Sequence, residues 1–405
     1  MTSRPHILYL LPSLNIGGTE RHLVTLAQRL VQRDWQVSVY GLGGDGPLRA
    51  ELQRGGVNVI LPPCASASQA AGRIMRLART ARHFLSVLRG LRPEIVHFLL
   101  PAAYLFGTPL AVIARVPIRV MTRQSLNLYQ KNTPGVWIAE RFFHTRMQAI
   151  LAVSRRVLEQ LRDEEGVPRS RLGLIYNGIE LAPSASSADK DAVRARLGLG
   201  AASLVMVMVA NLIPYKGHTD LLEALAIARP NLPEGWRVLI VGRDDGIGGE
   251  LREYSRRLSL NDNVLFLGQR SDVSALLEAS DIGILCSHQE GFSIAVLEGM
   301  AAGLPMIVTD VGGNAEAIID GASGLVVRPR DPAGLAGAIG RLAMDFALRT
   351  TLGEAARRRV QEEFSIDDCV RRHEKLYRAM LASSDVPVGT ILSDASVGPR
   401  IGLAN

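Results

Sequence analysis

Two successive series of short apolar segments alternate with segments of helical periodicity along this chain of 405 residues. The first series consists of HILYLLP at 6–12, WQVSVYGL at 35–42, VNVILP at 57–62, EIVHFLL at 94–100, RVMTRQ at 119–124 and AILAVS at 149–154. Buried parallel strands have this apolar character, and parallel neighbours need a crossover of a dozen or more residues, usually a helix. The pattern therefore predicts an α/β fold.

The same alternation begins again after PSASSADKD at 183–191, a stretch of small and polar residues that is typical of a linker. The second series consists of strands near 204–210, 236–242, 264–268, 282–287, 305–310 and 324–329. Open parallel sheets bind ligands beyond the carboxyl ends of their strands, so two such sheets facing each other would enclose a deep cleft. The prediction is two Rossmann-like domains, followed by a helix that packs back on the first domain and by a disordered tail. The predicted boundaries are 1–182, 190–364, 365–381 and 383–405.

Composition excludes several classes of protein. The apolar runs are far shorter than the ~20 residues that span a bilayer, and Pro12 interrupts the first one, so we expect neither a membrane span nor a signal peptide. Three widely spaced cysteines form neither a zinc set nor a disulfide framework, which suits a cytoplasmic protein. The first 185 residues are basic and the remainder is acidic, which indicates either an anionic partner other than nucleic acid or a solvated surface.

Two familiar motifs occur in an unsuitable context. Gly41–Gly46 spells G-x-G-x-x-G, but it follows the second strand, and the next strand ends without an acidic residue for a ribose. We therefore interpret it as a flexible turn rather than an NAD site. Asp189-Lys190-Asp191 spells D-x-D, but it lies in the linker, where acidic residues favour a helix start over a divalent metal site. We predict no metal and no cofactor.

Two loops that follow the first strand of each series offer groups for binding an anion. Gly17 and Gly18 lie where the first strand gives way to a helix, whose N-terminus attracts negative charge. ANLIPYKG at 210–217 repeats this arrangement, and Lys216 would add a point charge suited to phosphate. The alternatives are a structural bend at the glycines and an exposed loop lysine.

The stretch HQEGFSIAVLEGMAAGLPMIVTD at 288–310 predicts a strand-end loop, a short helix and a further strand. Ser293 is the expected N-cap, and the free amides of the first turn would face a pyrophosphate. Glu290 precedes the helix and Glu298 lies about a turn and a half inside it, so they would meet different parts of one extended ligand. Carboxylates readily accept hydrogen bonds from sugar or ribose hydroxyls. The alternative is an ordinary capped helix with an exposed Glu298.

This stretch resembles the E-x7-E signature of retaining glycosyltransferases with the GT-B fold, specifically glycosyltransferase family 4 (glycosyl transferases group 1). Further matches follow in the family's order over nearly the whole chain. They are NIGGTERHLVTLAQRL at 15–30, EIVHFLLPAAYLFG at 94–107, ILAVS at 150–154, IYNGIE at 175–180, ANLIPYKGH at 210–218 and GASGLVV at 321–327.

The resemblance implies roles for individual residues at a nucleotide-sugar donor site. Lys216 would contact the pyrophosphate, Glu298 would hold the ribose, and Glu290 would lie near the transferred sugar, with Glu290 and Lys216 as the catalytic pair. Gly17 and Gly18 would face the pyrophosphate and the acceptor. The remaining donor-site positions are Asn211, Gly268 and Arg270 in loops, and Gly291, Phe292, Ser293, Ile294 and Ala295 around the helix start.

The chain departs from the family at three positions. Asn211 stands where the family commonly has an arginine, so one phosphate-neutralising charge is missing or comes from elsewhere. The family's T-x-H is Thr122-Arg123-Gln124 here, and Gln124 cannot transfer a proton, although Arg123 is a candidate for the missing charge. A family H-x-H is reduced to His97. His97, Arg123 and Gln124 are the acceptor-side candidates.

The resemblance implies a metal-independent, retaining hexosyltransferase that moves a sugar from a UDP- or GDP-sugar to a saccharide or lipid-linked acceptor in surface polysaccharide or glycolipid synthesis. A GT-B-fold sugar-nucleotide epimerase and a non-catalytic nucleotide-sugar-binding module are the alternatives. The stretch 73–92 has six arginines and no acid, and its apolar residues recur at helical spacing. This pattern is compatible with peripheral binding to the inner face of an anionic membrane or with contact to a lipid-linked acceptor. A helix with a basic outer face is the alternative reading.

Overall fold

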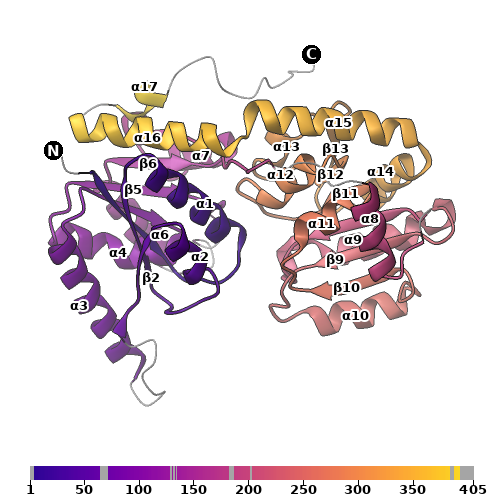
Figure 1. The fold of residues 1–405 in the computed structure, drawn as a ribbon, viewed down its shortest axis with the longest axis horizontal. Helices are drawn as coiled ribbons and strands as arrows, with labels where there is room; N and C mark the ends of the chain where they lie inside the picture. The colour runs from indigo at the N-terminus through magenta and orange to yellow at the C-terminus, as the bar shows by residue number, and fades with distance from the viewer. Residues whose placement is uncertain are drawn as a thin grey trace. The chain divides into compact units, whose positions relative to one another are not determined.

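The computed structural model describes residues 4–63, 72–127, 130, 133, 135–181, 187–200, 203–383 and 387–392. The chain divides into two compact units, one of Met1–Gly178 with Ile366–Val397 and one that contains Ile179–Ser365. Each unit has a single parallel sheet with helices packed on it (Figure 1). Among the described helices, none combines the length and the apolar composition that a membrane span requires.

The sheet of the first unit has the strand order β3-β2-β1-β4-β5-β6-β7, with every neighbouring pair parallel. Its strands are β1 His6–Leu11, β2 Gln36–Gly41, β3 Asn58–Ile60, β4 Ile95–Leu99, β5 Ile118–Arg123, β6 Ala149–Ala152 and β7 Leu172–Leu174. Its helices are α1 Gly18–Gln32, α2 Arg49–Arg54, α3 Arg73–Leu91, α4 Pro101–Ile113, α6 Val136–His144, α7 Arg155–Asp163, α16 Ile366–Ala382 and α17 Val388–Leu392.

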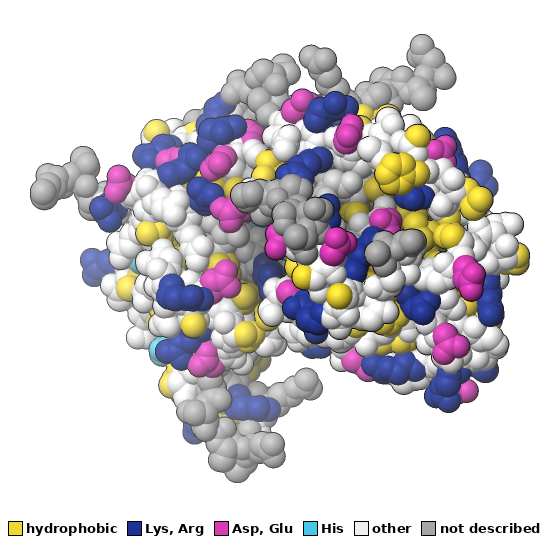
Figure 2. Space-filling view, turned by 45° about the vertical axis from the view of Figure 1, so that its right-hand side comes forward, with side chains coloured by type: hydrophobic (Ala, Val, Ile, Leu, Met, Phe, Trp, Pro, Cys, Tyr) yellow, Lys and Arg dark blue, Asp and Glu magenta, His cyan; other side chains and the backbone are white. Residues whose placement is uncertain are grey.

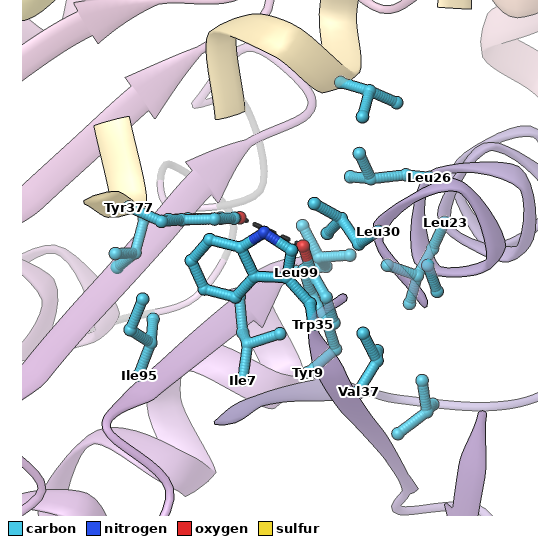
Figure 3. Close-up of a cluster of buried hydrophobic side chains, with 14 of the residues drawn as sticks. Ile7, Tyr9, Leu23, Leu26, Leu30, Trp35, Val37, Ile95, Leu99 and Tyr377 are labelled. Atoms are coloured by element: carbon cyan, nitrogen blue, oxygen red, sulfur yellow. Dashed lines mark hydrogen bonds between the residues drawn. The ribbon is translucent and has the colours of Figure 1, made fainter. Parts of the chain in front are cut away.

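The core of the first unit joins the beginning of the chain to its end. Trp35, Ile7 and Tyr9 are buried in one cluster with α1 and with Tyr377 of α16 (Figure 3). The Tyr9 and Tyr377 hydroxyls are hydrogen bonded at 3.0 Å, and the ring of Trp35 meets the ring of Tyr377 edge-on. Buried aromatic rings contribute large apolar area, and a buried hydroxyl needs such a partner. The return of α16 onto the first sheet is therefore built into its core.

The predicted disorder of 383–405 is wrong for one part of this segment. Residues Val388–Leu392 form the short helix α17, with Val388 and Ile391 buried in the core of the first unit. The side chains of Val388 and Leu392 pack directly over Gly173 of β7, where no larger residue would leave room for them. Val388 and Ile391, three positions apart, lie on one face of this short helix, and their burial anchors it on the existing sheet. The end of the tail, 393–405, lies outside the described residues.

The sheet of the second unit has the order β10-β9-β8-β11-β12-β13 and is also parallel. Its strands are β8 Val205–Val209, β9 Arg237–Val241, β10 Val264–Gly268, β11 Ile282–Leu285, β12 Met306–Thr309 and β13 Gly324–Val327. Its helices are α8 Ser187–Arg196, α9 His218–Ala228, α10 Gly248–Arg257, α11 Val273–Glu278, α12 Ile294–Ala301, α13 Asn314–Ala317, α14 Pro332–Met344 and α15 Phe346–Glu363.

These two sheets confirm the predicted α/β class and the tandem Rossmann-like arrangement. In the second unit the strand order changes direction between β8 and β11. Open α/β sheets bind ligands at such a switch point, just outside the carboxyl ends of the strands. The loops that follow β8 and β11 are therefore where the geometry of a site should be sought.

Candidate functional site

The loops after β8 and β11 bring Lys216 and Glu290 together. The Lys216 ammonium lies 2.6 Å from Glu290 Oε1, and the Ser287 hydroxyl donates to the same oxygen at 2.7 Å. The side chains are only 19% and 10% exposed, so this ion pair is largely shielded from water. The sequence places the two residues 74 positions apart, and the fold makes them direct neighbours.

Backbone contacts fix the two loops against each other. The His288 amide donates to the Tyr215 carbonyl at 2.7 Å, and the His288 ring bonds Asp220 Oδ2 at 2.8 Å. Gly217 has φ +75°, and a Cβ there would lie 2.0 Å from the Cys286 carbonyl oxygen. Only glycine fits this left-handed position at such a close approach. Lys216 is therefore held in place by the residue that follows it.

A third loop, which follows β12, also contacts this site, and none of its residues was predicted from the sequence. Gly312 has φ +54°, and a Cβ on it would lie 2.1 Å from the Glu290 carbonyl oxygen. The next amide, of Gly313, donates to the Gly291 carbonyl at 2.8 Å. The loop thus supports the backbone on either side of the first glutamate. Two adjacent glycines, one residue beyond a predicted strand, were the available signal for this packing.

Helix α12 begins where the sequence predicts. Ser293 is the N-cap residue in an extended conformation, but its side chain makes no capping hydrogen bond. Gly291, Phe292 and Ser293 are buried, Ile294 and Ala295 are partly buried, and the Phe292 ring packs 5.2 Å from that of Phe364. Glu298 is half-buried, more than one turn into the helix. The amides of the first turn are therefore not capped by the serine.

Titratable groups around Lys216 reflect its charge. Burial, and then the charge of Lys216, lowers the pKa of His218 to about 4, so this histidine is neutral at pH 7. The pKa of the Tyr215 hydroxyl is raised, chiefly by burial. The charge of Lys216 lowers this pKa, whereas the charges of Glu290 and Asp245 raise it. Tyr215 is 45% exposed, and its ring lies 5.6 Å from the Lys216 ammonium. The cation, two carboxylates and an exposed aromatic ring thus share one neighbourhood.

The other predicted positions of the second unit lie along the same edge of the sheet. Asn211 Oδ1 accepts from the Arg243 amide at 3.2 Å. Gly268, at the end of β10, adopts φ +67°. Arg270 forms an ion pair with Asp272 at 2.7 Å. All three therefore lie at carboxyl ends of strands or just beyond them.

In the first unit, Gly17 is the N-cap of α1 in an extended conformation, and Gly18 is the first helical residue. The side chain of Gln124, directly after β5, is partly buried and accepts a weak hydrogen bond from Asn177 at 3.4 Å.

His97 and Arg123 are buried inside the first unit. The His97 ring is fully buried between the Tyr377 hydroxyl and Thr122 Oγ1, each at 2.7 Å. Arg123 is 3% exposed and forms ion pairs with Glu140 at 2.9 Å and Glu165 at 2.8 Å. Both side chains therefore serve contacts within the first unit in this structure.

Glu140, His144 and Glu165 form a cluster whose ligand atoms lie within 4.8 Å of one another. Residue types and spacing would suit a metal ion, but the Arg123 guanidinium already contacts both carboxylates. Burial raises the pKa of Glu165, yet His144, Arg123 and Gln130 outweigh this effect and lower it overall. An internal arginine thus supplies the positive charge that a metal would bring.

The structure explains the residues of the G-x-G-x-x-G and D-x-D motifs without a cofactor or metal role. Gly43 and Gly46 lie against the backbone that follows β1, where a Cβ would come within 2.9 Å of the Pro12 oxygen and 2.5 Å of the Leu14 oxygen. They permit close packing of two loops. Asp189 lies in the first turn of α8, where a carboxylate interacts favourably with the helix dipole.

Comparison with known proteins adds to this geometry. The model of the glycosyl transferases group 1 matches residues 189–359, and that of Glycosyltransferase Family 4 matches residues 16–182. The chain belongs to glycosyltransferase family 4. The resemblance inferred from the sequence is thereby confirmed at the level of the family, and the enzyme is a glycosyltransferase with the GT-B fold.

Three relatives illustrate the match. An uncharacterised glycosyltransferase of Methanocaldococcus jannaschii is 26% identical, over 91% of this chain and 95% of that protein. A D-inositol 3-phosphate glycosyltransferase of Salinispora arenicola is 27% identical, over 84% of this chain and 83% of its own. A crystal structure of Anabaena HepE in complex with UDP and glucose has a TM-score of 0.81 at 23% identity, and covers 93% and 100% of the two chains. The similarity to Anabaena HepE is a similarity of fold.

Proposed function

We propose that this glycosyltransferase moves a hexose from a UDP- or GDP-sugar to a saccharide or lipid-linked acceptor, with retention of configuration. The observation that carries the proposal is the shielded Lys216–Glu290 pair beside the start of α12, at the switch point of the second sheet. The complex of Anabaena HepE with UDP and glucose supports a nucleotide-sugar donor. We place the reaction in surface polysaccharide or glycolipid synthesis, in the cytoplasm.

Lys216 and Glu290 would have different roles in sugar transfer. Sugar transfer passes through an oxocarbenium-like transition state, while negative charge grows on the departing diphosphate. Lys216 and the first-turn amides of α12, which the Ser293 side chain does not cap, are preorganised donors for that charge, so protein groups do the work without a metal. Glu290 orients Lys216 and would lie beside the transferred sugar. Glu298 would accept hydrogen bonds from the ribose hydroxyls.

On the acceptor side, Gln124 and the loop at Gly17 and Gly18 remain the candidates at the surface of the first unit. Gln124 lies at the carboxyl end of β5, where ligands of parallel sheets bind. Its amide can position a hydroxyl but cannot take its proton. The leaving diphosphate, or a water, would then receive the acceptor proton.

An assay of turnover decides between the three functions considered. The purified protein would be incubated with UDP- or GDP-sugars and an acceptor mixture in EDTA, and the anomeric configuration of the product determined by NMR. Transfer with retention, lost in Glu290→Gln although the variant still melts cooperatively as a folded protein, is the expected result. Donor consumption without acceptor would indicate an epimerase, and binding without turnover a non-catalytic module. Abolition of transfer by EDTA would contradict the metal-free mechanism.

We also propose that the first unit binds the anionic inner face of a membrane through α3 and α6. Ile74 and Leu77 of α3 are 85% and 59% exposed, and Ile138 of α6 is 65% exposed. The one acid of α6, Glu140, is buried, and α3 has none. Basic and acidic side chains are interspersed on most of the face drawn in Figure 2, whereas neither α3 nor α6 carries an exposed acid beside its arginines and exposed aliphatic side chains.

Liposome flotation tests the membrane proposal. Vesicles with anionic lipid should retain the protein at low salt and release it at high salt, because the attraction is partly electrostatic. A variant with Ile74→Ser and Leu77→Ser should bind more weakly at unchanged stability, since both side chains are exposed. Absence of binding to anionic vesicles at low salt would refute the proposal.

A further inference from the structure

The site described so far has too little positive charge for a diphosphate. Lys216 is the cation expected there, and Glu290 neutralises it at 2.6 Å. Asn211 stands where a second charge would be expected from the resemblance. Arg123 cannot provide that charge in this structure, because Glu140 and Glu165 hold it inside the first unit. A bound diphosphate would carry at least about two negative charges, so a cation besides Lys216 and the amides of α12 would strengthen binding.

The loop after β9 lies in the right place to provide it. In the sheet, β9 stands between β8, whose loop carries Lys216, and β10, whose loop carries Gly268 and Arg270. A nucleoside diphosphate that reaches from Lys216 to the proposed base loop would therefore pass over the end of β9. The cationic residue at that end is Arg243.

Arg243 is tied to the loop of Lys216 through the backbone. Its amide donates to Asn211 Oδ1 at 3.2 Å, and its carbonyl accepts from the Leu212 amide at 2.8 Å. Gly242 lets the two loops touch, since a Cβ there would lie 2.0 Å from the Ala210 oxygen. The asparagine side chain thus supports the backbone of the arginine.

The Arg243 side chain has a counter-ion that a ligand can replace. Asp245 accepts from its Nε at 2.6 Å and from its terminal nitrogen at 3.0 Å. The two side chains are 40% and 29% exposed, and ion pairs with this much exposure contribute little net free energy. A phosphate group accepts the same two donors in the same planar geometry. Exchange of Asp245 for phosphate therefore costs little.

We propose that Arg243 is a donor-site residue that exchanges Asp245 for the phosphate nearest the ribose when a nucleoside diphosphate binds. It thereby supplies the charge that Asn211 does not. This inference rests on the proposed nucleotide-sugar donor. It assigns Asp245 the role of holding the guanidinium in position while the site is empty.

Binding measurements on matched variants test the assignment. Calorimetry in EDTA would give the affinity for UDP and GDP, and ligand-observed NMR the affinity for uridine and guanosine. Arg243→Gln should weaken binding of the preferred diphosphate roughly 10-fold or more, and leave nucleoside binding unchanged. Asp245→Asn should tighten diphosphate binding, because it removes the competing carboxylate. Arg252→Gln is the control, since this exposed α10 arginine stacks on Phe266 and has Asp244 only at 4.0 Å.

Three results would overturn the assignment. Diphosphate binding by Arg243→Gln equal to that of the wild type, with Lys216→Ala weakened, would refute the role of Arg243 alone. Equal losses for nucleoside and diphosphate in Arg243→Gln would show a role other than phosphate binding. Failure of the wild-type protein to bind either diphosphate would overturn both this inference and the proposed function. Melting temperatures of all variants would exclude effects of unfolding.

Discussion

Buried histidines should make the first unit much more sensitive to acid than the second. His22, His97 and His373 are 8%, 0% and 5% exposed. Burial lowers the pKa of His22 to about 3 and that of His373 to about 4, and lowers the pKa of His97 well below its ordinary value. The neighbouring His373 lowers the pKa of His22 and of His97 further. All three are neutral in the folded protein at pH 7.

The sign and size of the effect follow from proton linkage. In the unfolded chain each histidine titrates near 6.5, so below this pH the unfolded state binds protons that the folded state excludes. Stability is therefore fully present above pH 6.5 and is lost as the pH falls toward 4. From pH 7 to pH 5 each histidine costs slightly less than about 2 kcal/mol, so the three together cost about 5–6 kcal/mol. That loss is comparable with the whole stability of a small domain.

The second unit provides an internal comparison. It contains His218, whose pKa is lowered to about 4, and would lose about 2 kcal/mol over the same interval. The chain has three tryptophans, of which Trp35 and Trp137 lie in the first unit and Trp236 in the second. Variants that retain only Trp35 or only Trp236 therefore allow separate urea unfolding curves by fluorescence. The curve for Trp35 should shift with pH by more than twice as much as that for Trp236.

A single substitution checks the cause. His373→Gln removes one titrating ring, and an amide can still bond the Cys369 carbonyl that His373 contacts at 2.9 Å. This variant should lose about 2 kcal/mol less between pH 7 and pH 5 than the parent protein. Equal pH losses in the two units, or an unchanged pH loss in His373→Gln, would refute the reasoning.

Three further substitutions test contacts at the site and beneath it. Gly217→Ala should strain the loop that holds Lys216, cost about 1–3 kcal/mol of stability and reduce transfer, with wild-type transfer as the contrary result. Arg123→Met should lower the free energy of unfolding in urea by about 3–5 kcal/mol, because two buried carboxylates lose their cation. Adding Glu140→Gln and Glu165→Gln removes those charges and should restore part of the lost stability. Glu298→Gln should raise the donor KM at unchanged stability, and the effect should be smaller for a 2′-deoxyribose donor than for a ribose donor. Equal effects on both would exclude a contact to the ribose 2′-hydroxyl.

The sequence was sufficient for the fold class, because alternation of apolar strands and amphipathic helices is a local property. It also placed Lys216 and Glu290 correctly at the ends of strands, since glycine-rich loops mark those ends. Their direct contact depends on neighbouring positions of β8 and β11 in the sheet, which local patterns do not specify.

Residues that depend on distant partners were harder to interpret. Arg123 ends a strand and is compatible with a ligand role, but Glu140 and Glu165, 17 and 42 positions away, hold it in the interior. His97 is likewise fixed by Tyr377, 280 positions later. Such pairings follow from tertiary packing. The short helix α17 shows the same limit, because five residues have too little periodicity to indicate order without the surface of β7.

The position of α16 also has a consequence for biosynthesis. Ile179 and Ser365 are bridged side by side, and the Ile179 amide bonds the Phe364 carbonyl at 2.9 Å, so the second unit is complete before α16 is synthesised. The core of the first sheet is completed only when Tyr377 has been synthesised. Synthesis of the residues of the second unit that come before it takes about 10–40 s at ordinary elongation rates. During that time Tyr9 and Trp35 lack part of their cover. A released chain truncated before residue 366 would carry a finished second unit and an open apolar surface on the first, which chaperones would bind.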